Sequence, residues 1–212
     1  MDLTPTALRG RYLTLEPMEE RHAPDLFEVM QDEEVCRYLF WPPPTKLEET
    51  LTLVREAKEL MARRQSLVFA QVWNQTRRAI GFTGLLEVRP ADRQVEIGST
   101  FLARQYWRSP ANTEPKYLLL EYCFETLGCV RVALKTDGRN IRSQEALARL
   151  GAVREGTLRK HMNIKGYQWD TVYFSILGSE WPACRVSRRP FRTCLPGTSL
   201  RTARATHRSA PG

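Results

Sequence analysis

The sequence is poor in the residues that build metal sites and disulfide frameworks. Its 212 residues include only five cysteines and three histidines. No two cysteines form a Cys-x-x-Cys pair, and the histidines lie far apart. Structural zinc sites and disulfide scaffolds need such residues in closely spaced groups. We therefore expect no metal site, no disulfide and no catalytic cysteine, and we place Cys123 in the core on an apolar helix.

Long apolar runs are also absent. No stretch approaches the ~20 residues that a membrane-spanning helix needs. The start, Met1-Asp2-Leu3-Thr4, lacks the basic end and apolar segment of a secretory signal. With 42% hydrophobic residues, the chain is too apolar to be disordered as a whole. We expect a globular cytoplasmic protein with one domain over residues 1–182 and no membrane partner.

Acidic residues are missing between Arg185 and Gly212, where seven arginines occur. This segment accounts for seven of the eight net positive charges of the chain. A nucleic-acid-binding domain is expected to carry its charge on a folded face, whereas this stretch has almost no apolar periodicity. We predict a flexible tail over residues 183–212 and no specific nucleic-acid site. The alternative is salt-sensitive binding to RNA or ribosomes, which removal of the tail would abolish.

The hydrophobic patterns predict an α/β (α+β) domain. Three strands joined by polar turns form an antiparallel meander, and a β-α-β-α-β-β succession follows it. Together they predict a mixed, mostly antiparallel central sheet of about seven strands flanked by helices. Thr45 is predicted to cap one helix, with Glu48 completing a capping box. The expected strands are 11–16, 67–73, 79–87, 94–102, 131–136, 153–159 and 171–177, and the expected helices are 24–30, 45–64, 113–127 and 141–150.

The passage from the strand at 94–102 to the next helix has the features of an anion site. The first amides of a helix have no internal acceptor, and the helix dipole favours negative charge there. The loop Trp107-Arg108-Ser109-Pro110-Ala111-Asn112-Thr113 adds a cation, hydroxyl groups and a helix cap. These groups suit a pyrophosphate, although an ordinary capped helix has the same pattern. The loop is neither a Walker loop nor a G-x-G-x-x-G turn.

A second passage of this kind lies between the strand at 131–136 and the helix at 141–150. Asn140 is a predicted N-cap, Ser143 lies in the first helical turn, and Gly151 is a predicted C-cap after Leu150.

Together the two passages resemble the GNAT superfamily of acyl-CoA N-acyltransferases, and more closely its RimJ/RimL-like branch. Asn140, Ser143, Leu150 and Gly151 match the family's Asn-x-x-Ser … Leu-Gly motif. The opening Leu8-Arg9-Gly10-Arg11 and the ending Tyr173-Phe174-Ser175-Ile176-Leu177-Gly178-Ser179-Glu180-Trp181-Pro182 also look like this branch. The resemblance covers roughly residues 8–182.

The resemblance implies a GNAT-like fold, acetyl-CoA as cosubstrate and direct acetyl transfer to a primary amine. It implies that the first passage binds the pyrophosphate and the second lies beside the pantetheine arm. The cofactor-binding residues expected on this basis are Phe101, Leu102, Arg108, Ser109, Pro110, Ala111, Asn112, Thr113, Asn140, Arg142 and Ser143.

The first loop departs from the family pattern, which has glycines where this chain has Arg108 and Pro110 and a small residue where it has Asn112. Because proline has no N–H, we expect the loss of one phosphate hydrogen bond and about tenfold weaker binding. The Arg108 guanidinium and the Asn112 amide are expected to offset this loss.

The resemblance also suggests catalytic residues. Glu96 is the expected base, on the same strand face as Gly98 and Thr100, although a structural pair with an arginine is the alternative. Glu87 is the rival base. Ser143 is the expected donor of a proton to the CoA thiolate, with Tyr173 as the fallback. His161 is expected in or near a polar turn, as a surface residue rather than a base.

Backbone amides of Phe101 and Leu102 are expected to bind the thioester carbonyl and the pantetheine arm, and the Asn140 amide is expected to hold the pantetheine or the thiol. The acceptor amine is expected to enter between the early helices, the loop at 41–44 and the hairpin at 161–170.

Trp41, Tyr167 and Trp169 are candidate lining residues for that entrance. The resemblance favours a protein N-terminal α-amine as the acceptor, as for a ribosomal-protein-alanine acetyltransferase, and a small amine or antibiotic is the alternative. A CoA-binding module without activity is a further alternative, because of Arg108 and Pro110. A homodimer is compatible with the sequence but not required by it.

Overall fold

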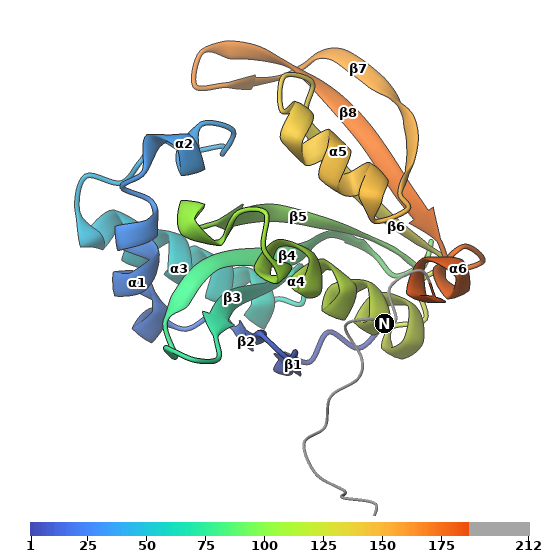
Figure 1. Cartoon of the computed structure of the whole chain (residues 1–212), viewed down its shortest axis with the longest axis horizontal. Helices are drawn as coiled ribbons and strands as arrows, with labels where there is room; N and C mark the ends of the chain where they lie inside the picture. Colours follow the sequence, from blue (N-terminus) through green and yellow to red (C-terminus); the bar gives the residue numbers. More distant parts are fainter. Residues whose placement is uncertain (187–212) are drawn as a thin grey trace, which may run out of the picture.

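The computed structural model describes residues 1–186 of the chain, and its centre is an eight-stranded sheet (Figure 1). The strand order is β1-β2-β3-β4-β5-β6-β8-β7, and only β5 and β6 run parallel to each other. This confirms the predicted mixed, mostly antiparallel sheet, with one strand more than expected. The strands are β1 (Leu8–Arg9), β2 (Leu13–Pro17), β3 (Leu67–Trp73), β4 (Ala79–Arg89), β5 (Gln94–Leu102), β6 (Arg131–Asp137), β7 (Val153–Ile164) and β8 (Tyr167–Leu177).

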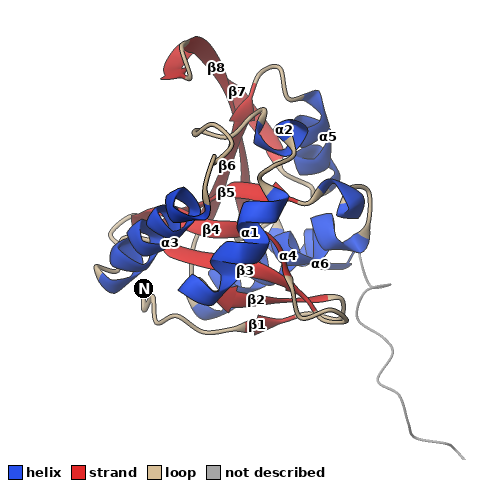
Figure 2. Cartoon of the chain, turned by 90° about the vertical axis from the view of Figure 1, so that its left-hand side faces the viewer, coloured by secondary structure: helices blue, strands red, loops and turns tan. Residues whose placement is uncertain are grey.

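Helices cover both faces of this sheet, and Figure 2 shows α3 and α4 on opposite sides of it. One core contains Leu26 of α1 and Val54 of α3, packed against β3 and β4. The other contains Leu119 of α4 and Leu147 of α5, packed against β5 and β6. The helices are α1 (Ala23–Val29), α2 (Glu33–Cys36), α3 (Leu47–Ala62), α4 (Pro110–Glu121), α5 (Ile141–Arg149) and α6 (Trp181–Val186).

The parallel strands β5 and β6 separate soon after they begin to pair. Their register covers only Gln94–Glu96 against Arg131–Ala133. Beyond these residues, the facing edges of β5 and β6 pair with no described strand. The result is a wedge-shaped gap in the middle of the sheet, which we call the notch.

A β-bulge at Ser99 changes the direction of the side chains along β5. Ser99 has a φ of 46°, and the pairing with β4 shifts between Gly84–Gly98 and Phe82–Phe101. Ile97 and Leu102 both lie in the core on the α4 side, although regular alternation would separate them. Glu96 and Gly98 do share a face, because a Cβ on Gly98 would lie 2.8 Å from Glu96 Oε1. The expectation that Thr100 lies on that same face is wrong, since the bulge reverses the alternation after Ser99.

Two predicted helix starts are also wrong. Helix α3 begins at Leu47, and Thr45 donates both its N–H and its hydroxyl to Glu49 rather than pairing with Glu48. Helix α4 begins at Pro110, three residues before the predicted start, with Ser109 as its N-cap. Proline is favoured in the first turn because its missing N–H has no partner there in any case.

The C-terminal part of the described structure departs further from the predicted element bounds. Strands β7 and β8 form one long hairpin, and His161 is an exposed residue of β7 near its turn, in agreement with the predicted surface position. Cys123 is fully buried, as predicted. The predicted domain boundary after residue 182 falls inside α6, and residues 187–212 of the predicted tail lie outside the described residues. No helix among the described residues is long and apolar enough to cross a membrane.

Candidate active site

A cavity of about 820 Å³ opens at the notch between β5 and β6. Its walls come from both strands, from the first turns of α4 and α5, and from the segment around α2. Most of the site residues predicted from the sequence line this one cavity: Glu96, Phe101, Leu102, Arg108, Ser109, Asn112, Thr113, Asn140, Arg142 and Ser143.

Pro110 and Ala111 do not line the cavity. Pro110 is the first residue of α4, and Ala111 is fully buried beneath it. The Ala111 N–H donates to the capping oxygen, Ser109 Oγ, at 3.2 Å. These two residues therefore shape the helix end, while their neighbours face the cavity.

Glu96 lies where β5 and β6 stop pairing. It is only 3% exposed, and Lys135 Nζ of β6 lies 3.0 Å from its Oε2. Burial raises the pKa of the Glu96 carboxyl above its usual 4.5, and the Lys135 ammonium opposes part of that rise. A carboxylate with a raised pKa is suited to accept a proton near neutral pH. Its ion-pair partner is a lysine, not the arginine of the structural alternative.

The rival catalytic residues lie outside the cavity lining. Glu87 has an exposed side chain 3.8 Å from Arg89. Tyr173 is half-buried, with its ring centroid 6.1 Å from that of His161. His161 is itself exposed, and its Nδ1 lies 3.0 Å from Thr171 Oγ1. Within the described structure, Glu96 is therefore the candidate base with direct access to the notch.

Positive charge gathers where α4 begins. Arg108 has a φ of 58°, in the left-handed region that favours glycine. From α5, the Arg142 guanidinium lies 3.5 Å from the centroid of the Trp107 ring. Burial lowers the pKa of Arg142, and the charges of Arg108 and Arg104 add to this effect. Cations beside a helix N-terminus match the chemistry of a pyrophosphate, so the residues present fit this part of CoA.

The backbone of β5 presents only one of the two predicted amides to the notch. The N–H of Ala103 donates to Ile80 O, so Ala103 points toward β4. Since backbone groups alternate in direction along a strand, those of Leu102 point into the notch and those of Phe101 point away from it. The Phe101 carbonyl accepts a hydrogen bond from Gln71 Nε2 at 3.0 Å. Leu102 is therefore better placed than Phe101 to bind a ligand through its amide.

The start of α5 forms as the sequence predicts. Asn140 is the N-cap, and its Oδ1 accepts the Ser143 N–H at 3.1 Å. This leaves the Asn140 NH₂ group without a bond to any described residue. The Ser143 hydroxyl lines the cavity and likewise has no hydrogen-bond partner in the described part of the chain. Both groups are available to a ligand.

Two lysines of the cavity were not predicted. Lys135 stands two residues beyond Ala133, which pairs with Glu96, so strand alternation would have placed it on the face of Glu96. Lys116 stands four residues after Asn112 on α4, and this spacing puts both on one helix face. Lys116 Nζ donates to Thr100 Oγ1 at 2.5 Å.

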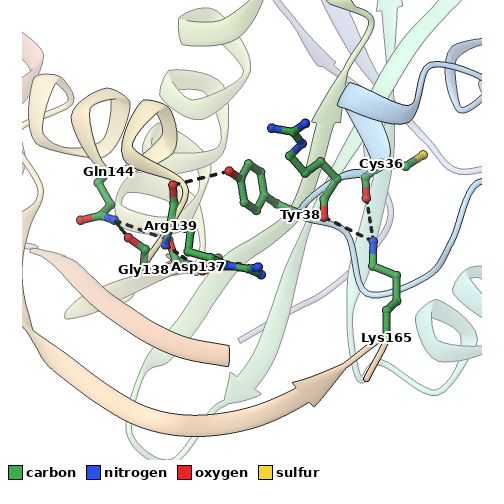
Figure 3. Close-up of polar contacts among 8 residues, drawn as sticks. Cys36, Tyr38, Asp137, Gly138, Arg139, Gln144 and Lys165 are labelled. Atoms are coloured by element: carbon green, nitrogen blue, oxygen red, sulfur yellow. Dashed lines mark hydrogen bonds and ion pairs between the residues drawn. The ribbon is translucent and has the colours of Figure 1, made fainter. Parts of the chain in front are cut away.

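Contacts of the segment around α2 with the β7–β8 hairpin and with the loop before α5 lie beside the cavity (Figure 3). At the tip of the hairpin, Lys165 Nζ donates to the carbonyl oxygens of Cys36 and Arg37 at 3.0 and 3.3 Å. Tyr38 Oη donates to Arg139 O at 3.5 Å. These bonds join segments that are more than 100 residues apart in the sequence.

Arg139 adds a further contact between these segments. Its guanidinium pairs with the buried Asp137 carboxylate and lies 3.5 Å from the centroid of the Tyr167 ring. Of the predicted entrance residues, Trp169 lines the cavity, whereas Tyr167 does not. Trp41 is also outside the lining, and its ring stacks on Phe82 at 6.0 Å. Of the three predicted entrance residues, only Trp169 therefore lines the cavity.

Comparison with known proteins decides the family. The model of the acetyltransferase (GNAT) domain matches residues 12–153. The chain belongs to the GNAT acetyltransferase family. It is 28% identical over 169 residues to the "Uncharacterized N-acetyltransferase p20" of Bacillus licheniformis, covering 80% of this chain and 94% of that one. It is 31% identical over 101 residues to the "Putative ribosomal N-acetyltransferase YdaF" of Bacillus subtilis, covering 48% and 55% of the two chains.

Among solved structures, a GCN5-related N-acetyltransferase from Brucella melitensis superposes with a TM-score of 0.83 at 31% identity. The match covers 88% of this chain and 85% of that chain. This GNAT protein is thus an N-acetyltransferase, and its family implies acetyl-CoA as the acyl donor. Over residues 1–186, no group of His, Cys, Asp and Glu side chains is arranged to hold a metal ion.

Proposed function

We propose that this GNAT acetyltransferase acts on a single primary amine carried by a peptide, namely the N-terminal α-amine of a protein. The charges of the cavity support an acceptor with few cations of its own. The carboxylates of its lining are Glu96, Asp137 and Glu145, and they already pair with Lys135, Arg139 and Arg149 respectively. The extra positive charges of a polyamine or an aminoglycoside would therefore find no unpaired carboxylate in this lining.

The uncharged lining supports a peptide. Tyr38, Phe40, Met162 and Trp169 line the cavity, and the rings of Phe40 and Trp169 meet edge to face at 5.4 Å. The free edge of β6 along the notch offers backbone groups to an extended chain. The name of the Bacillus subtilis relative, a ribosomal N-acetyltransferase, agrees with a protein acceptor.

The observation that carries the mechanism is the buried Glu96 at the notch, with Lys135 at 3.0 Å and a raised pKa. An amine is protonated at neutral pH and must lose a proton before it can attack a carbonyl carbon. Glu96 accepts that proton. Lys135 keeps the carboxylate ionised despite its burial, because its ammonium favours the charged form.

The remaining residues hold the donor and return a proton. Acetyl-CoA supplies an acetyl group activated as a thioester. Arg108, Arg142 and the start of α4 hold the phosphates, the Asn140 NH₂ group holds the pantetheine arm, and the Leu102 N–H polarises the carbonyl. The Ser143 hydroxyl, which has no other partner, donates a proton to the departing thiolate.

A panel of acceptors tests the proposed function. A peptide with a free α-amine is compared with the same peptide Nα-acetylated and carrying one lysine, and with spermidine. Release of the CoA thiol is followed at saturating acetyl-CoA. We expect a kcat/KM at least about tenfold higher for the free α-amine. The extra cations of spermidine find no unpaired carboxylate, and a lysine amine, with a pKa of about 10.4 against about 7.7–8.0 for an α-amine, is far less often neutral.

Each other outcome contradicts part of the proposal. A preference for spermidine would favour the small-amine alternative, and a preference for the lysine peptide would place the activity on side chains. Binding of acetyl-CoA without thiol release for any acceptor would favour the inactive module.

A further inference from the structure

Lys116 lies in the cavity but has no part in the mechanism above. Its side chain extends from the second turn of α4 toward β5, where Nζ lies 2.5 Å from Thr100 Oγ1. The Thr100 hydroxyl lies 2.7 Å from that of Thr83, which is fully buried. Lys116 makes no ion pair with any described residue, whereas Lys135 in the same cavity is paired with Glu96. The Lys116 amine is thus fixed in position by a hydroxyl group and carries no carboxylate partner.

The position of Thr100 places this amine beside the path of the acyl donor. The phosphate site at the start of α4 lies beyond Leu102, and the base Glu96 lies at the opposite end of the unpaired part of β5. A donor that reaches from one to the other along β5 passes Thr100. Lys116 and Glu96 line the same cavity and interact electrostatically, so a donor whose reactive end reaches Glu96 also brings that end near Lys116.

The protonation state of Lys116 suits it to attack a carbonyl carbon. Burial lowers the pKa of Lys116 to about 7, although the charge of Glu96 opposes the shift. At pH 7.5 about three-quarters of such an amine is neutral, against roughly a thousandth of an ordinary lysine. Only the neutral form has the free electron pair that nucleophilic attack needs.

We propose that Lys116 is an acyl acceptor within the protein itself, acetylated by the acetyl-CoA bound in the same cavity. The inference rests on the proposed function, because it needs the donor to bind at the notch. A C–N bond forms between Nζ and the acetyl carbon, the C–S bond of the thioester breaks, and the proton lost by Nζ passes to the CoA thiolate. No further reactant is needed.

The modification has a consequence for the cavity. The resulting amide is larger than the amine, cannot carry positive charge and lies beside Thr100 on the donor path. Acetylated protein is therefore expected to bind acetyl-CoA more weakly than unmodified protein, which makes the reaction self-limiting.

The test is the site of labelling in the full chain. The protein is incubated with ¹³C-acetyl-CoA at pH 7.5 without an acceptor, digested and analysed by mass spectrometry. We expect label at Lys116 at least about tenfold faster than at exposed Lys46 or at ion-paired Lys135, because only Lys116 is both unpaired and beside the donor. An excess of unlabelled CoA should suppress the label at Lys116 and leave that at Lys46 unchanged.

Labelling of Lys116 no faster than Lys46 would overturn the inference. If acetyl-CoA still binds by calorimetry and the peptide acceptor is still acetylated, the inference fails alone. If acetyl-CoA does not bind, the proposed function fails with it. The variant K116R checks that the labelled peptide is assigned to Lys116, because its label should be lost. If that variant does not fold, the labelling of the wild-type chain still tests the inference.

Discussion

Lys135 Nζ lies 3.0 Å from Glu96 Oε2, across the point where β5 and β6 separate. The lysine changes the ionisation of the carboxyl group. Burial raises the pKa of Glu96, and the Lys135 charge is the largest effect that lowers it. Glu96 is therefore ionised at a lower pH than its burial alone would allow, and Lys135 acts as a positioning residue for the base.

Replacing Lys135 by methionine should move the pH dependence of acetyl transfer. The pKa of Glu96 is already above 4.5, and loss of the ammonium raises it further. A base must be ionised, so kcat/KM falls as the pH drops through this pKa, and K135M should shift that fall to higher pH. A pH profile of kcat/KM measures the shift, and K135R should largely restore the wild-type profile. An unchanged profile in K135M would show that Glu96 does not control the rate.

Variants of Asn140 and Ser143 should distinguish an effect on helix stability from an effect on catalysis. The Ser143 hydroxyl has no partner, so S143A should leave the melting temperature unchanged while lowering kcat by about 10- to 100-fold. The Asn140 side chain caps α5, so N140A should lower the unfolding free energy by about 1 kcal/mol. Thermal melts and steady-state kinetics of both variants check this. A normal kcat in S143A would remove Ser143 from the mechanism.

Glu114 should matter for stability. Its buried carboxylate accepts the N–H groups of Arg11, Tyr12 and Leu13 at 2.7, 2.9 and 3.0 Å, and so joins α4 to the turn before β2. The amide of E114Q has only one accepting oxygen, so at least one buried donor loses its partner. We expect a loss of about 1–3 kcal/mol of unfolding free energy, or several degrees in melting temperature.

The matched control for this prediction is E56Q, at an exposed position on α3. It should melt with the wild type. Equal melting temperatures for E114Q and E56Q would contradict the role of Glu114.

Local features of this protein were predictable from sequence, and features that depend on distant residues were not. The Asn140 cap needs only the three residues that follow it, so sequence reasoning found it. The direction of the Thr100 side chain depends on the bulge at Ser99, which arises from the register of β5 against β4. Regular alternation therefore placed Thr100 on the wrong face.

The two cavity lysines were missed for the same reason, because their place in the site depends on distant residues. Lys135 and Lys116 become site residues only because β6 and α4 bring them to the notch. The spacing of each was visible in the sequence, but a lysine on a strand or helix is usually exposed. Burial and the absence of a carboxylate partner for Lys116 are tertiary properties.

The most direct test of the account is a single-turnover measurement of acetyl transfer in the wild type and E96Q. Saturating acetyl-CoA and the best acceptor of the panel are mixed, and acetylated product is measured over time between pH 6 and 9. A calorimetric titration of each protein with acetyl-CoA shows that the donor still binds. The account predicts that E96Q binds acetyl-CoA as the wild type does but transfers the acetyl group about 10²- to 10⁴-fold more slowly. Transfer by E96Q at the wild-type rate would contradict the assignment of Glu96 as the base.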